Sequence, residues 1–278
     1  MSRPVGPRGV RLSVIVTTYN NSHALELVLA GLARQSVGDY ELIVADDGSG
    51  AETASVISEH AARAAAPVRH LWHPDQGFRK CAISNRAILA AAGDYLVFFD
   101  GDCVPSRHCL AVHLAAARTD SYLAGGAVPL TRELADRLTA REVERGRLDR
   151  LGPWSRQVGK RRRLLVSRFP VLRDWMNRRV PREPSWRGGN SSAFAEHLHR
   201  VGGFDERFTY GFEDADLGHR LQAAGIHGRS VRYTAPVFHL DHARPYVRAD
   251  ELAANRALYR ENRARGLSRT LHGLRPTE

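Results

Sequence analysis

Long hydrophobic runs are absent from this sequence of 278 residues. No stretch reaches the roughly eighteen consecutive apolar residues that indicate a transmembrane helix, and residues 1–20 lack the apolar segment and cleavage site of a signal peptide. We therefore expect a cytosolic chain that begins with a flexible leader at residues 1–10. With 43% hydrophobic and 26% charged residues, the composition is that of a globular protein with a sizeable core, which excludes global disorder.

Cysteine and lysine are also scarce. The three cysteines, Cys81, Cys103 and Cys109, are an odd number without a C-x-x-C pair. We therefore expect buried thiols in a reducing compartment and no disulfide framework. Lysine occurs only at Lys80 and Lys160, so the positive charge comes almost entirely from arginine.

That positive charge is concentrated in one segment. Between Arg141 and Arg182 lie 14 basic and 4 acidic residues, a net charge of +10 in a chain whose total is +11. Such a block attracts anions, which include phosphate groups, acidic glycans and anionic lipid headgroups. We expect no nucleic-acid partner, because the block lacks interleaved aromatic residues and any known nucleic-acid motif.

Strand and helix patterns alternate through the first hundred residues. Apolar and β-branched runs predict four strands, at residues 12–18, 41–45, 68–72 and 94–99. Helical spacing predicts the helices between them, at about 22–35, up to about 63, and at 81–92. Such alternation is typical of parallel βαβ units. We therefore expect an α/β fold with a Rossmann-like, mostly parallel twisted sheet flanked by helices, and ligands at the carboxyl ends of its strands.

The pattern changes after about residue 130. The elements expected there are a helix to about 150, a basic proline-punctuated stretch to 184, a short strand after Gly189, a helix from Glu213, a strand-like run at 232–240 and a polar helix at 250–263. We expect one domain at 11–245, followed by a C-terminal helix and tail at 246–278 with Leu252 and Leu258 as docking residues. Its parts would be a nucleotide-binding half (11–128), a basic helical insert (129–184) and an acceptor or catalytic half (185–245).

Asp100-Gly101-Asp102 follows the fourth expected strand and places two carboxylates in one tight loop. Hard divalent cations such as Mg²⁺ or Mn²⁺ bind one or two carboxylates together with substrate phosphates. A turn or capping role is the alternative, because this spacing is common in loops. The position at the end of a buried strand favours a site for a metal or a sugar nucleotide.

Asp46 and Asp47 follow the second expected strand. A dinucleotide fingerprint is excluded there, because the third glycine is missing and the first strand ends in Thr17-Thr18-Tyr19-Asn20 where the glycines should lie. Two carboxylates at a strand end suit a nucleobase edge or ribose hydroxyls, and capping of the next helix is the alternative.

Glu213 and Asp214 begin the expected helix at 213, where a carboxylate can serve as general base or merely favour the positive helix end. His239 and His242 end the last strand-like run. A histidine there can complete a metal site with Asp102, whereas a structural role is the alternative. Trp186 can offer a sugar an aromatic platform or pack in the core.

Seven motifs occur in one order: LSVIVTTYN, LIVADDGS, GFRKCAISNRAI, YLVFFDGDCVP, WRGGNSSAF, GGFDERF and GFEDADLGHRL. Together they resemble the inverting glycosyltransferases of family 2 with the GT-A fold, and most of all the bacterial chondroitin-polymerase-type and galactosyltransferase-like members. The resemblance covers about residues 12–120 and 186–242. It implies a nucleotide-sugar donor and a divalent metal, Mn²⁺ or Mg²⁺.

The resemblance also implies roles for individual residues. Those at the nucleotide would be Thr18, Tyr19, Asn20, Asp47, Arg79, Asn85, Asp100 and Gly101, with Asp47 at a uracil-type base. Asp102 and His239 would hold the metal. Trp186, Gly188 and Gly189 would shape the sugar and acceptor pocket. Glu213 would hold sugar hydroxyls, and Asp214 would be the general base.

The implied reaction moves one sugar from a UDP-hexose or UDP-N-acetylhexosamine to the hydroxyl of a glycan, lipid-linked or small-molecule acceptor, by a single displacement that inverts the anomeric centre. A GDP-sugar or polyprenyl-phosphate-directed transferase of the same fold is the alternative, and a polyanion-binding protein without catalysis is a third.

Two features depart from the family. Cys103 stands where an apolar residue or methionine is usual, and the insert at about 141–184 has no counterpart. We expect residues 141–182 to face an anionic acceptor or the inner face of the membrane.

Overall fold

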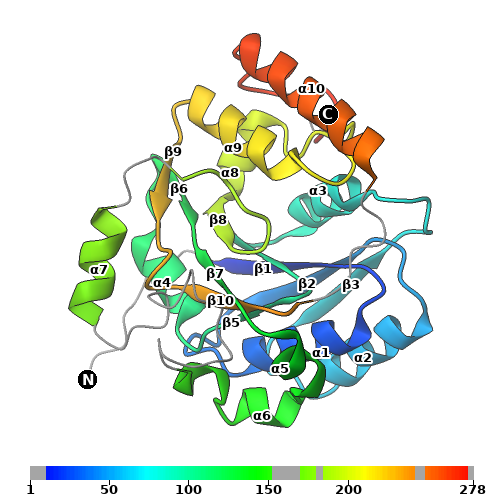
Figure 1. Ribbon diagram of the computed structural model, residues 1–278, viewed down its shortest axis with the longest axis vertical. Coiled ribbons are helices and arrows are strands. Elements are labelled where there is room, and N and C mark those ends of the chain that lie inside the picture. The colour runs from blue at the N-terminus through cyan, green and yellow to red at the C-terminus, as the bar shows by residue number, and fades with distance from the viewer. Residues whose placement is uncertain (1–10, 152–169, 180–183, 242–247, 275–278) are drawn as a thin grey trace.

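The computed structural model describes residues 11–151, 170–179, 184–241 and 248–274, and a twisted seven-stranded sheet forms its centre (Figure 1). The strands are β1 (Leu12–Thr18), β2 (Glu41–Asp46), β3 (Val68–Trp72), β4 (Tyr95–Asp100), β6 (Ser121–Ala124), β8 (Ser191–Phe194) and β9 (His227–Ser230). Their order in the sheet is β3-β2-β1-β4-β8-β6-β9. All neighbours are parallel except that β8 runs antiparallel to β4 and β6. The predicted mostly parallel sheet is confirmed.

Helices cover both faces of this sheet, because successive strand residues point to opposite sides. On one face Val14 and Phe99 share a core with α1 (Ser22–Ala33), while α2 (Ala51–Ala61) packs beside α1. On the other face Ile15 and Phe98 share a second core with residues of α3 (Lys80–Ala90), α8 (Ala195–Val201) and α9 (Glu213–Ala223). The C-terminal helix α10 (Ala249–Ala264) packs on α9, with Leu258 against the second core as expected.

A second, three-stranded sheet lies beside the first, and the sequence did not predict it. It contains β5 (Cys103–Pro105), β7 (Gly126–Pro129) and β10 (Pro236–His239), in the order β5-β10-β7. The expected strand at 232–240 is therefore shorter, because the backbone turns at Val231, whose carbonyl accepts hydrogen bonds from the amides of Thr234 and Ala235. The small sheet joins the loop after β4 to the end of β10, which are far apart in the sequence.

The single helix expected to about residue 150 is wrong. The chain instead forms α5 (Arg132–Arg137), α6 (Ala140–Glu144) and the 3₁₀ turn η1 (Leu148–Arg150). The break occurs at Thr139, whose backbone is extended and whose hydroxyl accepts from the Glu142 amide, while the Glu142 carboxylate accepts from the Thr139 amide. This reciprocal capping box starts a new helix.

Two more helices complete the described fold, α4 (Cys109–Ala116) and α7 (Pro170–Arg178), of which α7 belongs to the basic insert. The leader, residues 152–169 and 180–183 of the insert, His242 and the last residues of the tail lie outside the described residues. Among the described helices, none combines the length and the hydropathy needed to cross a membrane. All three cysteines are buried and free, as expected. The division into halves and insert stays a prediction.

Candidate active site

A cavity of about 860 Å³ lies at the carboxyl ends of the parallel strands, the edge at which α/β sheets bind ligands. The ends of β1, β2 and β4 line it on one side, and the loop before β8 and the start of α9 line it on the other. Its lining residues are Thr17, Thr18, Tyr19, Asn20, Asn21, Asp47, Gly77, Phe78, Lys80, Asp100, Gly101, Asp102, Ser185, Trp186, Arg187, Tyr210, Gly211, Phe212, Glu213, Asp214, Ala215 and His239.

Eleven of the fifteen residues that the sequence predicted for the site line this cavity. They are Thr18, Tyr19, Asn20, Asp47, Asp100, Gly101, Asp102, Trp186, Glu213, Asp214 and His239. Arg79, Asn85, Gly188 and Gly189 lie outside the lining. The structure thus brings most of the expected residues together, while the role of each one stays a prediction.

Asp47 is a buried carboxylate held from two sides. Its Oδ1 lies 2.7 Å from His73 Nε2, and its Oδ2 accepts a hydrogen bond of 3.0 Å from the Arg79 amide. Burial raises the pKa of Asp47 above its ordinary value despite these contacts. The Arg79 guanidinium bonds instead to Gln76 and to the Pro74 carbonyl. Arg79 therefore positions Asp47 through its backbone, and the expected place of its side chain near a diphosphate stays a prediction.

Asn85 lies outside the cavity lining. Its amide nitrogen donates to the Phe204 carbonyl and to Glu206, and its oxygen accepts from the Phe204 amide. The side chain is buried and uses these bonds to tie α3 to the turn after α8. These contacts favour a structural role, and the expected place of Asn85 near the diphosphate and ribose stays a prediction.

Lys80, at the start of α3, is the main site residue that the sequence analysis missed. Its ammonium donates to Asp100 Oδ1 at 2.6 Å, and Thr17 donates to the same oxygen at 3.0 Å. Burial alone would lower the pKa of Lys80, but the negative charges of Asp100, Asp214 and Glu213 outweigh it and raise the pKa well above its ordinary value. Its rarity was a usable signal, because it is one of only two lysines in an arginine-rich chain.

Asp214 lies in the first turn of α9 and faces the cavity with one carboxylate oxygen engaged. Its Oδ2 accepts a 2.7 Å hydrogen bond from the Gly188 amide, and its Oδ1 has no hydrogen-bond partner among the described residues. A side chain at position 188 would crowd this pair, since a Cβ there would lie 3.0 Å from Asp214 Oδ1 and 3.1 Å from Lys80 Nζ. Gly188 thus contributes its backbone rather than a surface of the pocket.

The surroundings of Glu213 and Asp214, at the start of α9, raise the pKa of both carboxyl groups. Burial and the adjacent Asp214 charge raise the pKa of Glu213 to about 7, against the lowering effect of Lys80. Burial likewise raises the pKa of Asp214, and Lys80 partly opposes it. A carboxylate with a raised pKa and a free oxygen is suited to accept a proton near neutral pH.

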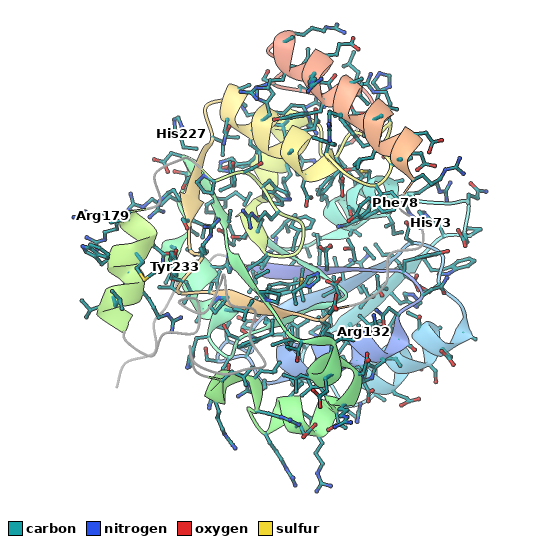
Figure 2. The ribbon with its side chains drawn as sticks, viewed as in Figure 1. His73, Phe78, Arg132, Arg179, His227 and Tyr233 are labelled. Atoms are coloured by element: carbon teal, nitrogen blue, oxygen red, sulfur yellow. The ribbon has the colours of Figure 1, made fainter. Side chains whose placement is uncertain are left out.

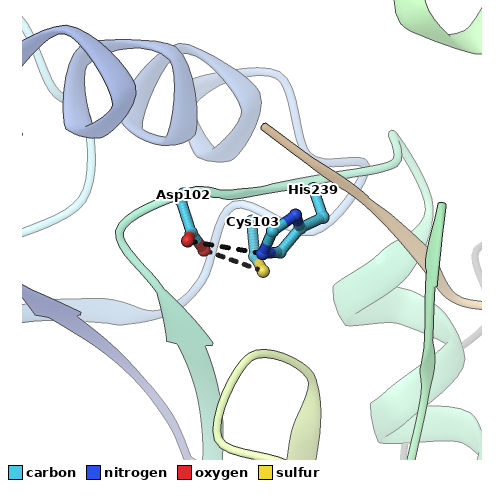
Figure 3. Close-up of side chains that lie close together, drawn as sticks. All are labelled: Asp102, Cys103 and His239. Atoms are coloured by element: carbon cyan, nitrogen blue, oxygen red, sulfur yellow. Dashed lines mark hydrogen bonds and ion pairs between the residues drawn. The ribbon is translucent and has the colours of Figure 1, made fainter. Parts of the chain in front are cut away.

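Asp102 and His239 meet where the small sheet joins the end of β4 (Figure 3). Asp102 Oδ2 lies 3.4 Å from His239 Nε2, and the Asp102 carbonyl accepts a 2.9 Å hydrogen bond from the Leu240 amide. The Cys103 thiol lies 3.2 Å from Asp102 Oδ1. A carboxylate and an imidazole that face a cavity large enough for substrate phosphates are a donor set that fits a divalent metal.

Aromatic side chains divide between the core and the cavity mouth. Trp186 is 1% exposed and packs edge-on against Phe98, with ring centroids 5.4 Å apart. Its burial favours the core interpretation over the sugar platform. Phe78 and Tyr210, which the sequence analysis missed, line the cavity as an edge-to-face pair with centroids 5.8 Å apart, and Figure 2 shows Phe78 close below α3. These two rings also line the cavity and can contact a ligand there.

Comparison with known proteins identifies the family. Residues 13–174 match Glycosyl transferase family 2, and residues 177–243 match the N-terminal domain of galactosyltransferase. Among curated relatives, the chondroitin synthase of Escherichia coli is 26% identical over 242 residues, which cover 79% of this chain and 33% of that protein. The chain thus spans about a third of the length of this relative.

Two solved structures show how far the fold is shared. The mannosyltransferase of Pyrobaculum calidifontis in complex with GDP-Man and Mn²⁺ superposes with a TM-score of 0.57 at 20% identity, over 85% of this chain and 59% of that one. GalNAc-T7 with UDP, GalNAc and Mn²⁺ gives a TM-score of 0.62 at 13% identity, over 92% and 48% of the two chains. The chain therefore belongs to glycosyl transferase family 2 and has the GT-A fold, as its ordered motifs predicted.

Proposed function

We propose that this protein transfers one sugar from a UDP-hexose or UDP-N-acetylhexosamine to an acceptor hydroxyl, with inversion at the anomeric carbon and Asp214 as general base. The observation that carries the proposal is the Asp214 carboxylate, which lines the cavity, has a raised pKa and has a buried Oδ1 without a hydrogen-bond partner among the described residues. The likeness to GalNAc-T7 with UDP supports the nucleotide, and the likeness to the E. coli chondroitin synthase supports a sugar acceptor.

The proposed reaction needs one base on one face of the sugar. The Gly188 amide holds Asp214 Oδ2, which leaves Oδ1 to take the proton of the acceptor hydroxyl. The acceptor oxygen then attacks the anomeric carbon from the side opposite the nucleotide, and one such displacement inverts the centre. Glu213, the neighbouring acid, would hold sugar hydroxyls, and its charge helps to raise the pKa of the pair.

The donor would lie along the carboxyl ends of β1, β2 and β4, with its base near Asp47 and its ribose or sugar near Asp100. Asp102 and His239 would hold a divalent metal, which when bound supplies positive charge to the departing diphosphate. Lys80 would add a second positive charge on the same side, because its ammonium lies between Asp100 and the start of α9. The solved structures with Mn²⁺ support a divalent metal at this place.

Thermal stabilisation tests the donor class directly. Melting of the purified chain is measured with UDP, GDP, CMP and dTDP, each with and without Mn²⁺, for the wild type, Asp102→Ala and the exposed control Asp136→Ala on α5. A nucleotide at about 100 times its Kd adds about 2.7 kcal/mol, a rise of roughly 5–10 °C. We expect this rise with UDP and Mn²⁺, lost in Asp102→Ala and kept in the control.

The other outcomes of the same experiment decide between the alternatives. A rise with GDP alone would replace the UDP donor by a GDP-sugar, as the likeness to the mannosyltransferase with GDP-Man allows. Stabilisation by polyanions and by no nucleotide would overturn the enzyme and favour a polyanion-binding protein. For the reaction itself, nucleotide release from UDP-sugars and the anomeric configuration of the product are read by NMR, and retention of configuration would contradict the mechanism.

We also propose that α7 brings the enzyme to an anionic membrane surface. Arg173 and Asn177 anchor the helix, since Arg173 donates to the Thr234 carbonyl at 2.7 Å and Asn177 donates to the Thr234 hydroxyl at 2.9 Å. The remaining side presents Val171 at 83% and Trp175 at 52% exposure. Apolar side chains beside arginines are the pattern of a helix that lies in the headgroup region.

Cosedimentation with vesicles tests this contact. We expect the wild type to bind anionic vesicles, to bind neutral ones weakly, and to lose binding in a Val171→Ser, Trp175→Ser variant. Leu271→Ser removes an equally exposed apolar side chain elsewhere (90% exposed) and serves as the control. Equal binding of the wild type and the α7 variant would refute the contact, and binding to soluble acidic glycans alone would assign the basic segment to the acceptor.

A further inference from the structure

Cys103 and His239 are direct partners across the antiparallel pair of β5 and β10. Directly opposite residues in such a pair have side chains on the same face, with Cβ atoms about 4.5–5.5 Å apart. The strand register therefore fixes the thiol and the imidazole side by side, and Asp102 adds a carboxylate from the residue before β5. The three ligand atoms of Asp102, Cys103 and His239 all lie within 4.8 Å of one another (Figure 3).

The two separations that involve Asp102 are close to those between the ligands of a tetrahedral metal, and the sulfur and the imidazole nitrogen lie within 4.8 Å of each other. With Zn–S of about 2.3 Å and Zn–N or Zn–O of about 2.0–2.1 Å, the ligand atoms of a tetrahedral site lie roughly 3.3–3.5 Å apart. Here Asp102 Oδ2 lies 3.4 Å from His239 Nε2, and the Cys103 sulfur lies 3.2 Å from Asp102 Oδ1. A small rotation of the carboxylate suffices to bring one oxygen into such a set.

We propose that Cys103 is a third protein ligand of this site and that it makes the site prefer Zn²⁺ or Co²⁺ over Mn²⁺ and Mg²⁺. Thiolate and imidazole favour zinc and cobalt, whereas carboxylates and waters suit magnesium and manganese. On binding, the sulfur–metal bond replaces the S–H bond and the proton passes to solvent. Three protein ligands leave the fourth position of a tetrahedral metal to a phosphate oxygen of the sugar nucleotide. Only this last assignment rests on the proposed function.

Optical titration of the full chain with Co²⁺, without nucleotide, tests the ligand set. We expect a near-ultraviolet sulfur-to-cobalt charge-transfer band in the wild type, its loss in Cys103→Ser, and its displacement by Zn²⁺. Competition with a chelator gives the affinities, and Cys103→Ser should weaken Zn²⁺ by at least about tenfold while Mn²⁺ changes less than about threefold. The control Cys109→Ser removes a buried thiol elsewhere and should keep the band.

Two further variants keep the test decisive. Cys103→Val retains an apolar side chain of similar size in the core, so it replaces the serine variant if that one fails to fold, as judged by its melting curve. His239→Ala should lose tight Co²⁺ binding as well. A wild type that binds Co²⁺ without the charge-transfer band, or equal Zn²⁺ affinities in wild type and Cys103→Ser, would overturn the proposal and leave the thiol as a hydrogen-bond donor to Asp102.

The metal result and the transfer result are independent. If the band is present but no nucleotide stabilises the protein, the thiolate site stands and the proposed function fails. If UDP-sugar transfer proceeds with Mn²⁺ and the band is absent, the function stands and the thiolate site fails.

Discussion

Helix α9 carries two acids, the half-buried Asp214 and the buried Asp216, that lie two residues apart and have different surroundings. Asp216 is completely buried, and both its oxygens are bonded, Oδ2 to Arg220 Nε at 2.7 Å and Oδ1 to the Asn262 amide at 2.8 Å. Asp214 has one oxygen on the Gly188 amide and one without a partner among the described residues. Residues at this spacing point to different sides of a helix, so α9 has a structural side and a cavity side.

The comparison shows how one helix can hold the fold together and still present a reactive group. Arg220 donates to the carbonyls of Val201 and Gly203, both at 2.7 Å. The Asp216–Arg220 pair thereby joins the end of α8, α9 and, through Asn262, α10. A buried ion pair is costly to break, whereas a carboxylate with one oxygen unbonded can change its protonation state. Stability and reactivity are thus assigned to different residues of one element.

The largest expected effect comes from the cavity side. Asp214→Asn keeps the size of the side chain but removes the base, so kcat should fall by about 10²–10⁴-fold. The melting temperature should stay the same or rise, because a buried group with a raised pKa no longer has to ionise. Nucleotide release and thermal melting measure the two quantities. If the melting temperature falls together with kcat, Asp214 supports the fold instead.

Asp216→Ala should produce the opposite pattern. It leaves the Arg220 charge buried without its partner, which should cost about 3–5 kcal/mol of the free energy of unfolding. Turnover per folded molecule should change less than about tenfold, because the residue does not line the cavity. Denaturant unfolding gives the stability, and Asp250→Ala, an exposed acid on α10, is the matched control. If Asp216→Ala has the same free energy of unfolding as the wild type, Asp216 does not stabilise the fold, and its contrast with Asp214 fails.

Glu213→Gln sharpens the comparison through pH. The folded-state pKa of Glu213 is about 7, above its ordinary value of 4.5. Below pH 4.5 the acid is therefore neutral in the folded and in the unfolded state, and it imposes no penalty on the free energy of unfolding. The penalty grows as the pH rises from 4.5 to 7, where only the unfolded state ionises, and it reaches up to about 3 kcal/mol above pH 7. The variant should therefore be more stable than the wild type at pH 8 and equal to it at pH 4. Equal stability at both pH values would contradict the raised pKa.

The smallest expected effect is a shift of the pH–rate profile. Lys80 lowers the pKa of Asp214, so Lys80→Met should raise that pKa. Since the base works only when ionised, the acid limb of kcat/KM should move to higher pH. Arg86→Met, on the same helix and bonded to the Trp72 carbonyl, should leave the limb in place. A limb that does not move in Lys80→Met would show that the ammonium acts only through Asp100.

Strands β1, β2 and β4 could be read from the sequence because each is a short apolar run bounded by polar residues, and such runs form buried parallel strands. β3, with the sequence VRHLW, is partly polar, and its Arg69 and His70 are exposed. β1 and β3 have the predicted bounds. The small sheet could not be read, because its three strands of three or four residues pair across long separations. Local pattern contains no information on such pairing.

The candidate site was predicted where residues follow strand ends or open a helix, as Asp102 and Asp214 do. It was missed where only the fold brings a residue in, as for Lys80 from the start of α3 and His73 against Asp47. Asn85 shows the reverse case. Its motif resembles that of a nucleotide site, whereas its side-chain amide bonds the Phe204 backbone, a contact that cannot be read from the sequence.

The pairing of β5 with β10 also determines how late in synthesis the cavity can be completed. A chain that emerges from the ribosome presents β1, β2 and β4, with Asp47, Asp100 and Asp102, long before His239 exists. Neither the small sheet nor the start of α9 can form until the last third of the chain has been made. A growing chain can therefore present the ends of β1, β2 and β4 early, whereas Asp214 and His239 are made last, so the cavity can be completed only after the last third of the chain has been synthesised.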